Sequence, residues 1–353
     1  MTRFYPPSAH PSHWTTDRGI TTPADFGDPL AEYHTLMAKV AWVDFSHPGV
    51  VALSGPDHLD FLGGLITNQV RHVSATRSIH ASLLTPQGRY LWDFTLVEEK
   101  TGTEPARVLL VTEPDRVPEL IQQMAFYRLR AKVQISDEGA AFHLLGLVGP
   151  ETDQAIGSLF PGLGPLDAAL GTTVSPETGL RLWRDPRHEK FGWRLLLPAT
   201  QWRTMSERMA TRLPPAGWTA WEAYRLHHAL PRGGNEMIPQ ETLPLEAGLW
   251  EMNGVDFGKG CYVGQETTAR THHRATLKKR LFQVAGPPGV NWPPGTTVHR
   301  PDGQEIGVVT SHCPLTGTAL ALLRLAEVAH TEGSLRIQGQ PVTATKPSWA
   351  AWT

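Results

Sequence analysis

The amino-acid sequence predicts an α+β chain with two similar lobes followed by a small β-barrel or sandwich. Three observations lead to this prediction: a repeated strand-and-helix segment, a hairpin and second helix after each copy, and a change of pattern beyond residue 276. A chain of 353 residues is also long enough for two or three hydrophobic cores. We therefore expect the lobes in the regions 1–140 and 141–275, with interleaving allowed, and the barrel at 276–353.

The repeat consists of an apolar strand, a Gly-Pro pair and an acidic residue. Its copies are Val51-Ala-Leu-Ser-Gly-Pro-Asp57 and Leu145-Gly-Leu-Val-Gly-Pro-Glu151. Proline is favoured in the first turn of a helix, so each copy should lead into one. Apolar residues do follow at helical spacing, at 59–66 and less regularly at 152–160. The alternative is a chance likeness between two short strand–helix units.

Each copy is followed by a predicted hairpin and a second helix. In the first copy, Thr85-Pro-Gln-Gly88 suits a type I turn between two strands. Beyond residue 281, prolines and glycines punctuate short apolar runs without a convincing helix, which indicates the barrel. The expected elements are strands at 79–84, 90–97 and 107–112 with a helix at 114–128, then strands at 180–184 and 191–197 with a helix at 200–213.

Composition restricts the class of protein. Thirty-two Lys and Arg against 34 Asp and Glu give no overall attraction to nucleic acid or anionic lipid, so any anion site must be local. The two cysteines, Cys261 and Cys313, are too few for a disulfide framework and suit a reducing cytoplasm. The N-terminus lacks a signal-peptide core, and no apolar run approaches the roughly 20 residues of a membrane span. We expect a cytoplasmic chain without a membrane partner, and the histidine spacings predict no metal site.

The densest candidate site is Gly258-Lys-Gly-Cys-Tyr-Val-Gly-Gln-Glu266, in which glycines surround a single thiol. The ammonium of Lys259, or a helix beginning at Gln265, would favour the nucleophilic or metal-binding thiolate of Cys261. The alternative is that Cys261 is a small buried apolar residue in a glycine-rich turn.

An aromatic stripe and a strand aspartate are further candidates. A helix over 220–229, with Thr219 and Glu222 as a capping box, carries Trp221 in a stripe of aromatic residues that is more often part of a core. Asp93 lies on the predicted strand 90–97, where burial of its charge is costly unless a donor pairs with it. The alternative for Asp93 is the solvated face of an edge strand.

The run Arg270-Thr-His-His-Arg-Ala-Thr-Leu-Lys-Lys-Arg280 concentrates positive charge. Such a run is most often a solvated face, here a linker into the barrel. Its functional interpretation is a site for an anionic ligand tail. No aromatic interleaving supports base stacking, so direct nucleic-acid binding is not expected.

The segment Lys259–Glu266 resembles the signature of the YgfZ family, Lys-Gly-Cys-Tyr-x-Gly-Gln-Glu, at every fixed position. The resemblance extends from about residue 28 to the barrel. It includes the flanking segments Val43-Asp-Phe-Ser46, Leu65-Ile-Thr-Asn68, Ile238-Pro-Gln240 and Thr268-Ala-Arg270.

This resemblance implies a fold like that of the glycine-cleavage T-protein: two ferredoxin-like lobes and a barrel in a ring around a tetrahydrofolate channel. It also implies support of iron–sulfur proteins, including a tRNA-modifying enzyme, with folate and iron–sulfur enzymes or their assembly machinery as partners. The residues carried over as catalytic are Lys259, Cys261 and Asp93, and those carried over as folate contacts are Asp93, Trp221, Tyr262, Gln265, Glu266 and Arg270.

The alternative function is aminomethyl transfer from a lipoyl carrier to tetrahydrofolate, as in the T-protein. The T-protein pattern has paired aspartates where this chain has Trp92-Asp93, which favours the first function. Whether the chain catalyses a chemical step is left open by the sequence.

Overall fold

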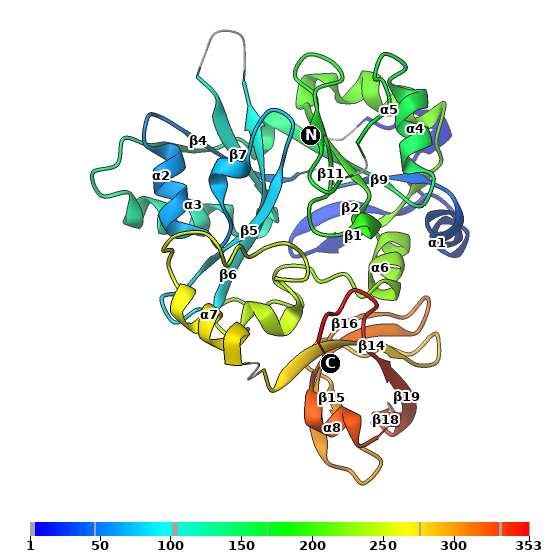
Figure 1. The fold of residues 1–353 in the computed structure, drawn as a ribbon. Helices are drawn as coiled ribbons and strands as arrows, with labels where there is room; N and C mark the ends of the chain where they lie inside the picture. Colours follow the sequence, from blue (N-terminus) through cyan, green and yellow to red (C-terminus); the bar gives the residue numbers. More distant parts are fainter. Residues whose placement is uncertain are drawn as a thin grey trace.

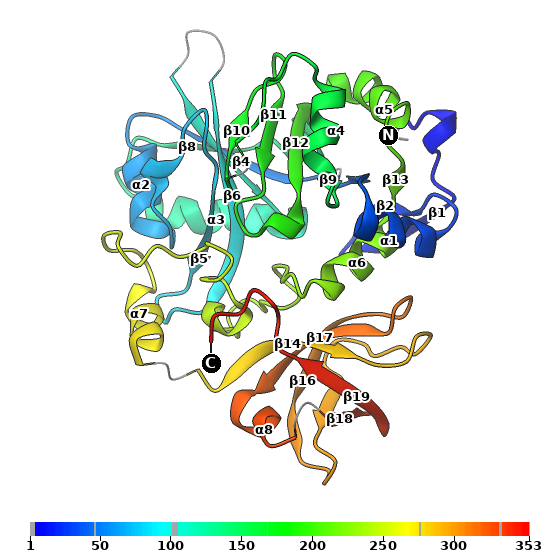
Figure 2. The ribbon, with the colours of Figure 1, turned by 45° about the vertical axis from the view of Figure 1, so that its right-hand side comes forward.

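The computed structural model describes residues 4–45, 47–100, 105–167, 169–274, 277–331 and 334–352. Two sheet-containing lobes lie side by side, and a barrel packs beneath them (Figure 1). The rotated view shows the three units arranged around a central region (Figure 2). Ser46 of one family-like segment, and Ala275 and Thr276 of the basic run, lie outside the described residues.

The first lobe is a five-stranded antiparallel sheet in the order β5-β6-β7-β4-β8. Helices α2 and α3 cover one face, where Leu62, Leu120 and Met124 pack against Phe94 in a buried cluster. The elements are β4 (Gly49–Ser54), α2 (His58–Leu65), β5 (Ile79–Leu84), β6 (Tyr90–Glu99), β7 (Arg107–Thr112), α3 (Val117–Arg128) and β8 (Gln134–Asp137).

The second lobe is a six-stranded sheet in the order β10-β11-β12-β9-β3-β13. Strand β3 precedes the whole first lobe in the sequence, so the two lobes interleave along the chain. Its elements are α1 (Pro29–Ala38), β3 (Ala41–Asp44), β9 (Phe142–Val148), α4 (Thr152–Leu159), β10 (Thr173–Val174), β11 (Arg181–Arg184), β12 (Trp193–Pro198), α5 (Trp202–Ala210), β13 (Pro215–Ala216) and α6 (Trp218–His227).

The sequence repeat corresponds to a structural repeat. The strand of each copy, β4 or β9, occupies the same place in its sheet and leads into a helix, α2 or α4. The glycines that follow, Gly55 and Gly149, both have positive φ, at 104° and 123°. A Cβ at either would lie about 2 Å from a backbone oxygen, 2.3 Å from that of Lys132 and 2.1 Å from that of Lys39. Only glycine lets the neighbouring backbone approach so closely in both lobes.

The tail forms a closed barrel in the order β14-β17-β16-β15-β18-β19. It packs on α6 through a buried cluster that includes Leu226, Leu281 and Cys313. The sequence predicts no helix here, but the short helix α8 follows β17 directly. The elements are β14 (Lys279–Ala285), β15 (Thr297–His299), β16 (Glu305–Cys313), β17 (Thr318–Arg324), α8 (Leu325–Ala329), β18 (Ser334–Ile337) and β19 (Gln340–Thr345).

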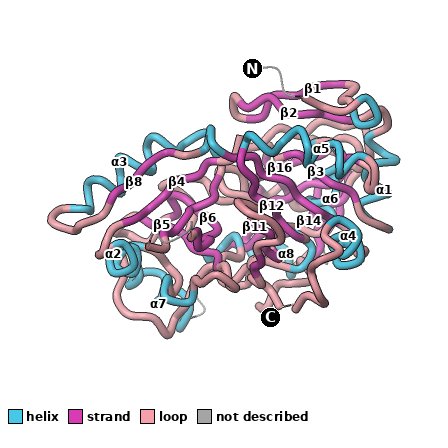
Figure 3. The backbone as a smooth tube through the Cα atoms, turned by 90° about the horizontal axis from the view of Figure 1, so that it is seen from above, coloured by secondary structure: helices cyan, strands magenta, loops and turns pink. Residues whose placement is uncertain are grey.

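The remaining elements connect these units. Hairpin β1–β2 lies over the second lobe, and α7 lies beside the first (Figures 1 and 3). Within the described residues, no helix is long and apolar enough to cross a membrane. The bounds are β1 (His13–Asp17), β2 (Ile20–Asp25) and α7 (Gln265–Arg274), with 3-10 helices at Pro7–Ala9, Val70–His72, Pro114–Arg116, Gly139–Ala141, Glu189–Phe191, Ala199–Gln201 and Pro244–Ala247.

Local predictions were accurate for the strands and less so for helix ends. The predicted strands 79–84 and 107–112 coincide with β5 and β7. The predicted capping box before α6 is wrong, because α6 begins at Trp218 after Gly217 without a side-chain cap. Glu222 instead binds Arg225, which lies one turn further along the same helix.

Candidate functional site

The two sheets face each other across a buried interface and a cavity. Apolar residues of both sheets meet in one cluster, in which Val97 and Leu109 of the first lobe pack with Trp183 and Leu196 of the second. Beside this cluster the faces separate around about 1080 Å³ of space free of protein atoms, including the part open to solvent. Polar and apolar side chains of both lobes, of the β1–β2 hairpin and of α6 line this space.

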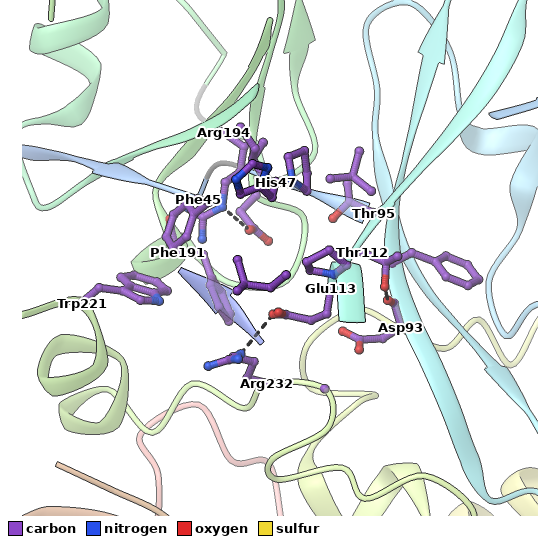
Figure 4. Close-up of a pocket in the computed structure, with 18 of the residues that line it drawn as sticks. Phe45, His47, Asp93, Thr95, Thr112, Glu113, Phe191, Arg194, Trp221 and Arg232 are labelled. Atoms are coloured by element: carbon purple, nitrogen blue, oxygen red, sulfur yellow. Dashed lines mark hydrogen bonds and ion pairs between the residues drawn. The ribbon is translucent and has the colours of Figure 1, made fainter. Parts of the chain in front are cut away.

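Asp93 lies on the cavity wall of the first lobe, on β6. Alternation along β6 turns Asp93 toward the cavity, whereas its neighbour Trp92 packs in the core beneath the helices. The Tyr90 hydroxyl donates a 2.7 Å hydrogen bond to the carboxylate, and the main-chain oxygen of Asp93 accepts one from Thr112 (Figure 4). The Asp93 carboxylate is thus held in place with lone pairs left for another donor.

His80 stands next to this carboxylate, with Nε2 3.7 Å from an oxygen of Asp93. Its side chain is almost fully buried, and this burial lowers the pKa of His80 to about 4. The imidazole is therefore neutral near pH 7, and the carboxylate gains no cation from it. Gly233 completes the surroundings, because a Cβ there would lie 2.2 Å from Asp93 Oδ1 and 2.3 Å from the Tyr90 hydroxyl.

Trp221, on α6, lies across the pocket from Asp93 (Figure 4). Its ring packs edge-on against Phe45 at 5.2 Å and stacks with Tyr224 at 6.0 Å between centroids. The guanidinium of Arg194 lies 5.4 Å from the indole, and burial lowers the pKa of Arg194 to about 10. These contacts fix the indole as a rigid part of the cavity wall.

A network of ion pairs joins the remaining sides of the cavity. Arg232 bonds to Glu113 at 3.1 Å (Figure 4) and to Asp17 of the N-terminal hairpin. Arg18 forms an ion pair with the other oxygen of Glu113 at 2.9 Å. Sequence reasoning missed these residues, together with His80, Arg194 and Gly233. Only the Gly233-Gly234 pair carried a signal, since adjacent glycines mark close approach of the backbone.

The Lys259–Glu266 segment folds onto the first lobe. The ammonium of Lys259 donates to the main-chain oxygens of Gly63 and Ile66 at the end of α2, and it lies 4.8 Å from the ring of Tyr262. Burial lowers the pKa of Lys259 to about 8. Helix C-termini attract cations, so this lysine has a structural role that its position in the motif did not reveal.

The rest of the segment turns sharply before α7. The side chain of Gln265 accepts a hydrogen bond from the main-chain N–H of Tyr262. Gly264 has a positive φ of 83°, and a Cβ at this position would lie only 2.5 Å from the main-chain oxygen of Thr85. Cys261 is exposed to solvent. The structure therefore places Asp93 and Trp221 on opposite walls of one cavity. The other predicted site residues are not among those that line it, namely Lys259, Cys261, Tyr262, Gln265, Glu266 and Arg270, and Tyr262 is buried.

Comparisons with known proteins agree with this architecture. The GCVT N-terminal domain model matches residues 8–173, and the CAF17 C-terminal beta-barrel domain model matches residues 278–352. A solved structure of glycine cleavage system aminomethyltransferase T from Bartonella henselae aligns with a TM-score of 0.78 over 96% of this chain and 94% of that chain. At 18% identity this likeness shows the fold, and it confirms the predicted T-protein-like arrangement with a barrel.

Two relatives by sequence carry the same name. The mitochondrial iron-sulfur cluster assembly factor IBA57 of Homo sapiens is 33% identical over 299 residues, which are 80% of this chain and 76% of that protein. The protein of the same name from Mus musculus is 34% identical over 337 residues, 88% of this chain and 86% of that protein.

These relatives correct the expected location. The small number of cysteines and the absence of a signal-peptide pattern favoured the cytoplasm, but the relatives are mitochondrial proteins, so that prediction is wrong. A reducing compartment leaves thiols free in either case, which is why cysteine count could not separate the two. Identity at this level over most of both chains decides kinship, and the chain belongs to the IBA57 family of iron–sulfur cluster assembly factors, which is related to YgfZ.

Proposed function

We propose that this chain is an iron–sulfur cluster assembly factor that binds tetrahydrofolate, or another folate form, in the central cavity. The observation that carries the proposal is the position of Asp93 and Trp221 on opposite walls of one cavity, in a chain whose relatives are iron–sulfur cluster assembly factors. The clients would be iron–sulfur enzymes or their assembly machinery, including an enzyme that modifies tRNA.

The chemistry of the cavity supports a folate. A pterin presents ring N–H donors, and Asp93 is a charged acceptor with unused lone pairs beside a neutral histidine. Because Gly233 has no Cβ, the Asp93 carboxylate can occupy its position beside it without a clash. Trp221 offers an aromatic wall that can contact a flat ring system. In this arrangement the protein binds and orients the folate, which would supply the one-carbon chemistry.

Calorimetric titration with tetrahydrofolate tests the binding. The wild-type chain should bind, and Asp93→Asn should weaken binding at least about tenfold, because a hydrogen bond to a charged group is worth about 1.5–3 kcal/mol. Trp221→Ala should weaken it as well. Trp14→Ala, at an exposed tryptophan outside the cavity, is the matched control and should bind as wild type. A flat wild-type titration would overturn the proposal.

We propose that Cys261 acts in the iron–sulfur step, as thiol donor, thiol acceptor or transient ligand. Its exposure supports contact with a partner protein more than contact with the cavity ligand. Cys261→Ser should keep folate binding but fail to restore iron–sulfur enzyme activity in a strain that lacks the protein. Cys313→Ala, at the buried thiol, is the control and should restore activity. Full restoration by Cys261→Ser would remove this thiol from the mechanism.

A second candidate function is aminomethyl transfer, which the T-protein-like fold favours. The T-protein pattern has paired aspartates where this chain has Trp92-Asp93. This difference is a weak argument against aminomethyl transfer, because Trp92 packs in the core of the lobe and only Asp93 faces the cavity. Release of ammonia from an aminomethyl-lipoyl carrier, dependent on tetrahydrofolate, would identify this activity. No release under conditions where folate binds would exclude it.

A further inference from the structure

The end of α3 and its connection to β8 carry the two most exposed large apolar side chains among the described residues. Phe126 is 73% exposed and Leu129 is 89% exposed. Phe126 lies in the last turn of α3, and Leu129 is the C-cap residue three positions further on. This connection lies at the outer edge of the first lobe (Figures 1 and 3). Exposed apolar groups that lie close together indicate an interaction surface more strongly than single ones do.

The local backbone conformation gives no reason for a leucine at position 129. Leu129 ends α3 with φ 44°, in the left-handed region where glycine or asparagine is usual. The connection is nevertheless held firmly, because its backbone packs against Gly55 and the Lys132 main-chain N–H donates to the Asp57 carboxylate at 2.7 Å. The apolar side chains are therefore displayed from an ordered support.

Positively charged side chains lie beside Leu129. Arg128, Arg130 and Lys132 are exposed and line a hollow with residues 55–56. In the described part of the chain no carboxylate forms an ion pair with any of the three, although Asp57 lies nearby and accepts from the main chain. A cation near the C-terminus of a helix interacts favourably with the helix dipole. This interaction does not explain why three cations lie here together with two exposed apolar side chains.

From this combination we propose that the α3–β8 connection docks on a bilayer that contains anionic phospholipid. Phosphate headgroups would occupy the hollow between the three cations, and Phe126 and Leu129 would enter the interface beside them. Exposed cations beside exposed apolar groups match a bilayer surface, where anionic headgroups adjoin an apolar interior. The sequence predicts no membrane partner, but surface docking needs neither a spanning helix nor a positive net charge.

The proposed surface is independent of the folate site. Helix α3 covers the outer face of the first sheet, and the cavity lies on the inner face. Variants of the connection should therefore leave tetrahydrofolate binding unchanged, and loss of folate binding would not affect docking.

Flotation of the full chain with vesicles tests the proposal. Wild type should bind vesicles of phosphatidylcholine with about one-third phosphatidylglycerol, and it should not bind phosphatidylcholine alone. Exchange of Arg128, Arg130 and Lys132 for Gln should weaken binding about 100-fold, at about fivefold for each cation. Phe126→Ser with Leu129→Ser should weaken it at least about tenfold. Thermal unfolding should show that both variants fold, because these side chains lie outside the core.

The matched control removes three exposed cations elsewhere, through Lys39→Gln, Arg212→Gln and Arg324→Gln. It lowers the net charge equally and should bind vesicles as wild type. Equal loss in this control, no binding of the wild type, or equal binding to phosphatidylcholine alone would each overturn the proposal. A concentration-dependent dimer that the Phe126 and Leu129 variant abolishes, without vesicle binding, would identify a second copy of the chain as the occupant instead.

Discussion

The buried imidazole of His80 should make the stability of the protein fall between pH 6.5 and pH 4. Burial lowers the pKa of His80 from 6.5 to about 4 in the folded chain, while the unfolded chain keeps the ordinary value. Below pH 6.5 the unfolded state therefore takes up a proton that the folded state resists. Stability is fully present above pH 6.5 and is lost as the pH falls toward 4. The loss should reach about 2 kcal/mol at pH 5 and about 3 kcal/mol at pH 4.

Urea unfolding, followed by tryptophan fluorescence at pH 7 and pH 5, measures this loss. The free energy of unfolding of wild type should fall by about 2 kcal/mol more than that of His80→Gln, which has no imidazole to protonate. Other titrating groups cancel in this difference. His34→Gln, at an exposed histidine of α1, should keep the wild-type dependence. Equal pH dependence in wild type and His80→Gln would refute the inference that the cavity holds a neutral histidine beside Asp93.

Three further outcomes follow from close contacts. Gly233→Ala should weaken tetrahydrofolate binding about 10- to 100-fold in calorimetry, because its Cβ must displace Asp93, while Gly157→Ala, with open space around it, should bind normally. Lys259→Met should lower the free energy of unfolding in urea by about 1–3 kcal/mol, because two carbonyls at the end of α2 lose their donor; an unchanged value would deny this role. Gly264→Ala should destabilise by more than about 1 kcal/mol and speed proteolysis of the loop before α7, and equal cleavage rates would contradict the strain argument.

The cavity explains how one fold can serve different chemistry. A likeness to an aminomethyltransferase establishes the scaffold, and the side chains in the cavity decide what it does. In this chain the cavity holds a carboxylate, a neutral imidazole and a rigid indole, and the exposed thiol lies on another surface. The proposed ligand binding and the proposed role of Cys261 should therefore be separable by mutation.

The sequence by itself determined the local elements and the kinship. Strand alternation placed Asp93 on the face opposite Phe94, and the Gly-Pro repeat predicted two lobes of one architecture. The resemblance to YgfZ pointed to a family related to the one that the comparisons show. These features depend on residues close together along the chain, where spacing and turn chemistry set the geometry.

The tertiary structure alone decided which residues meet. Lys259 reaches Gly63 across 196 positions, and Arg232 bonds to Asp17 across 215. No periodicity connects residues so far apart, because their contact depends on how the sheets and helices pack. The cavity likewise depends on packing, because its walls come from both lobes and α6. Packing also determines that β3 joins the second sheet although it precedes the first lobe in the sequence. Local preferences fix each element, and burial of their apolar faces against one another fixes the site.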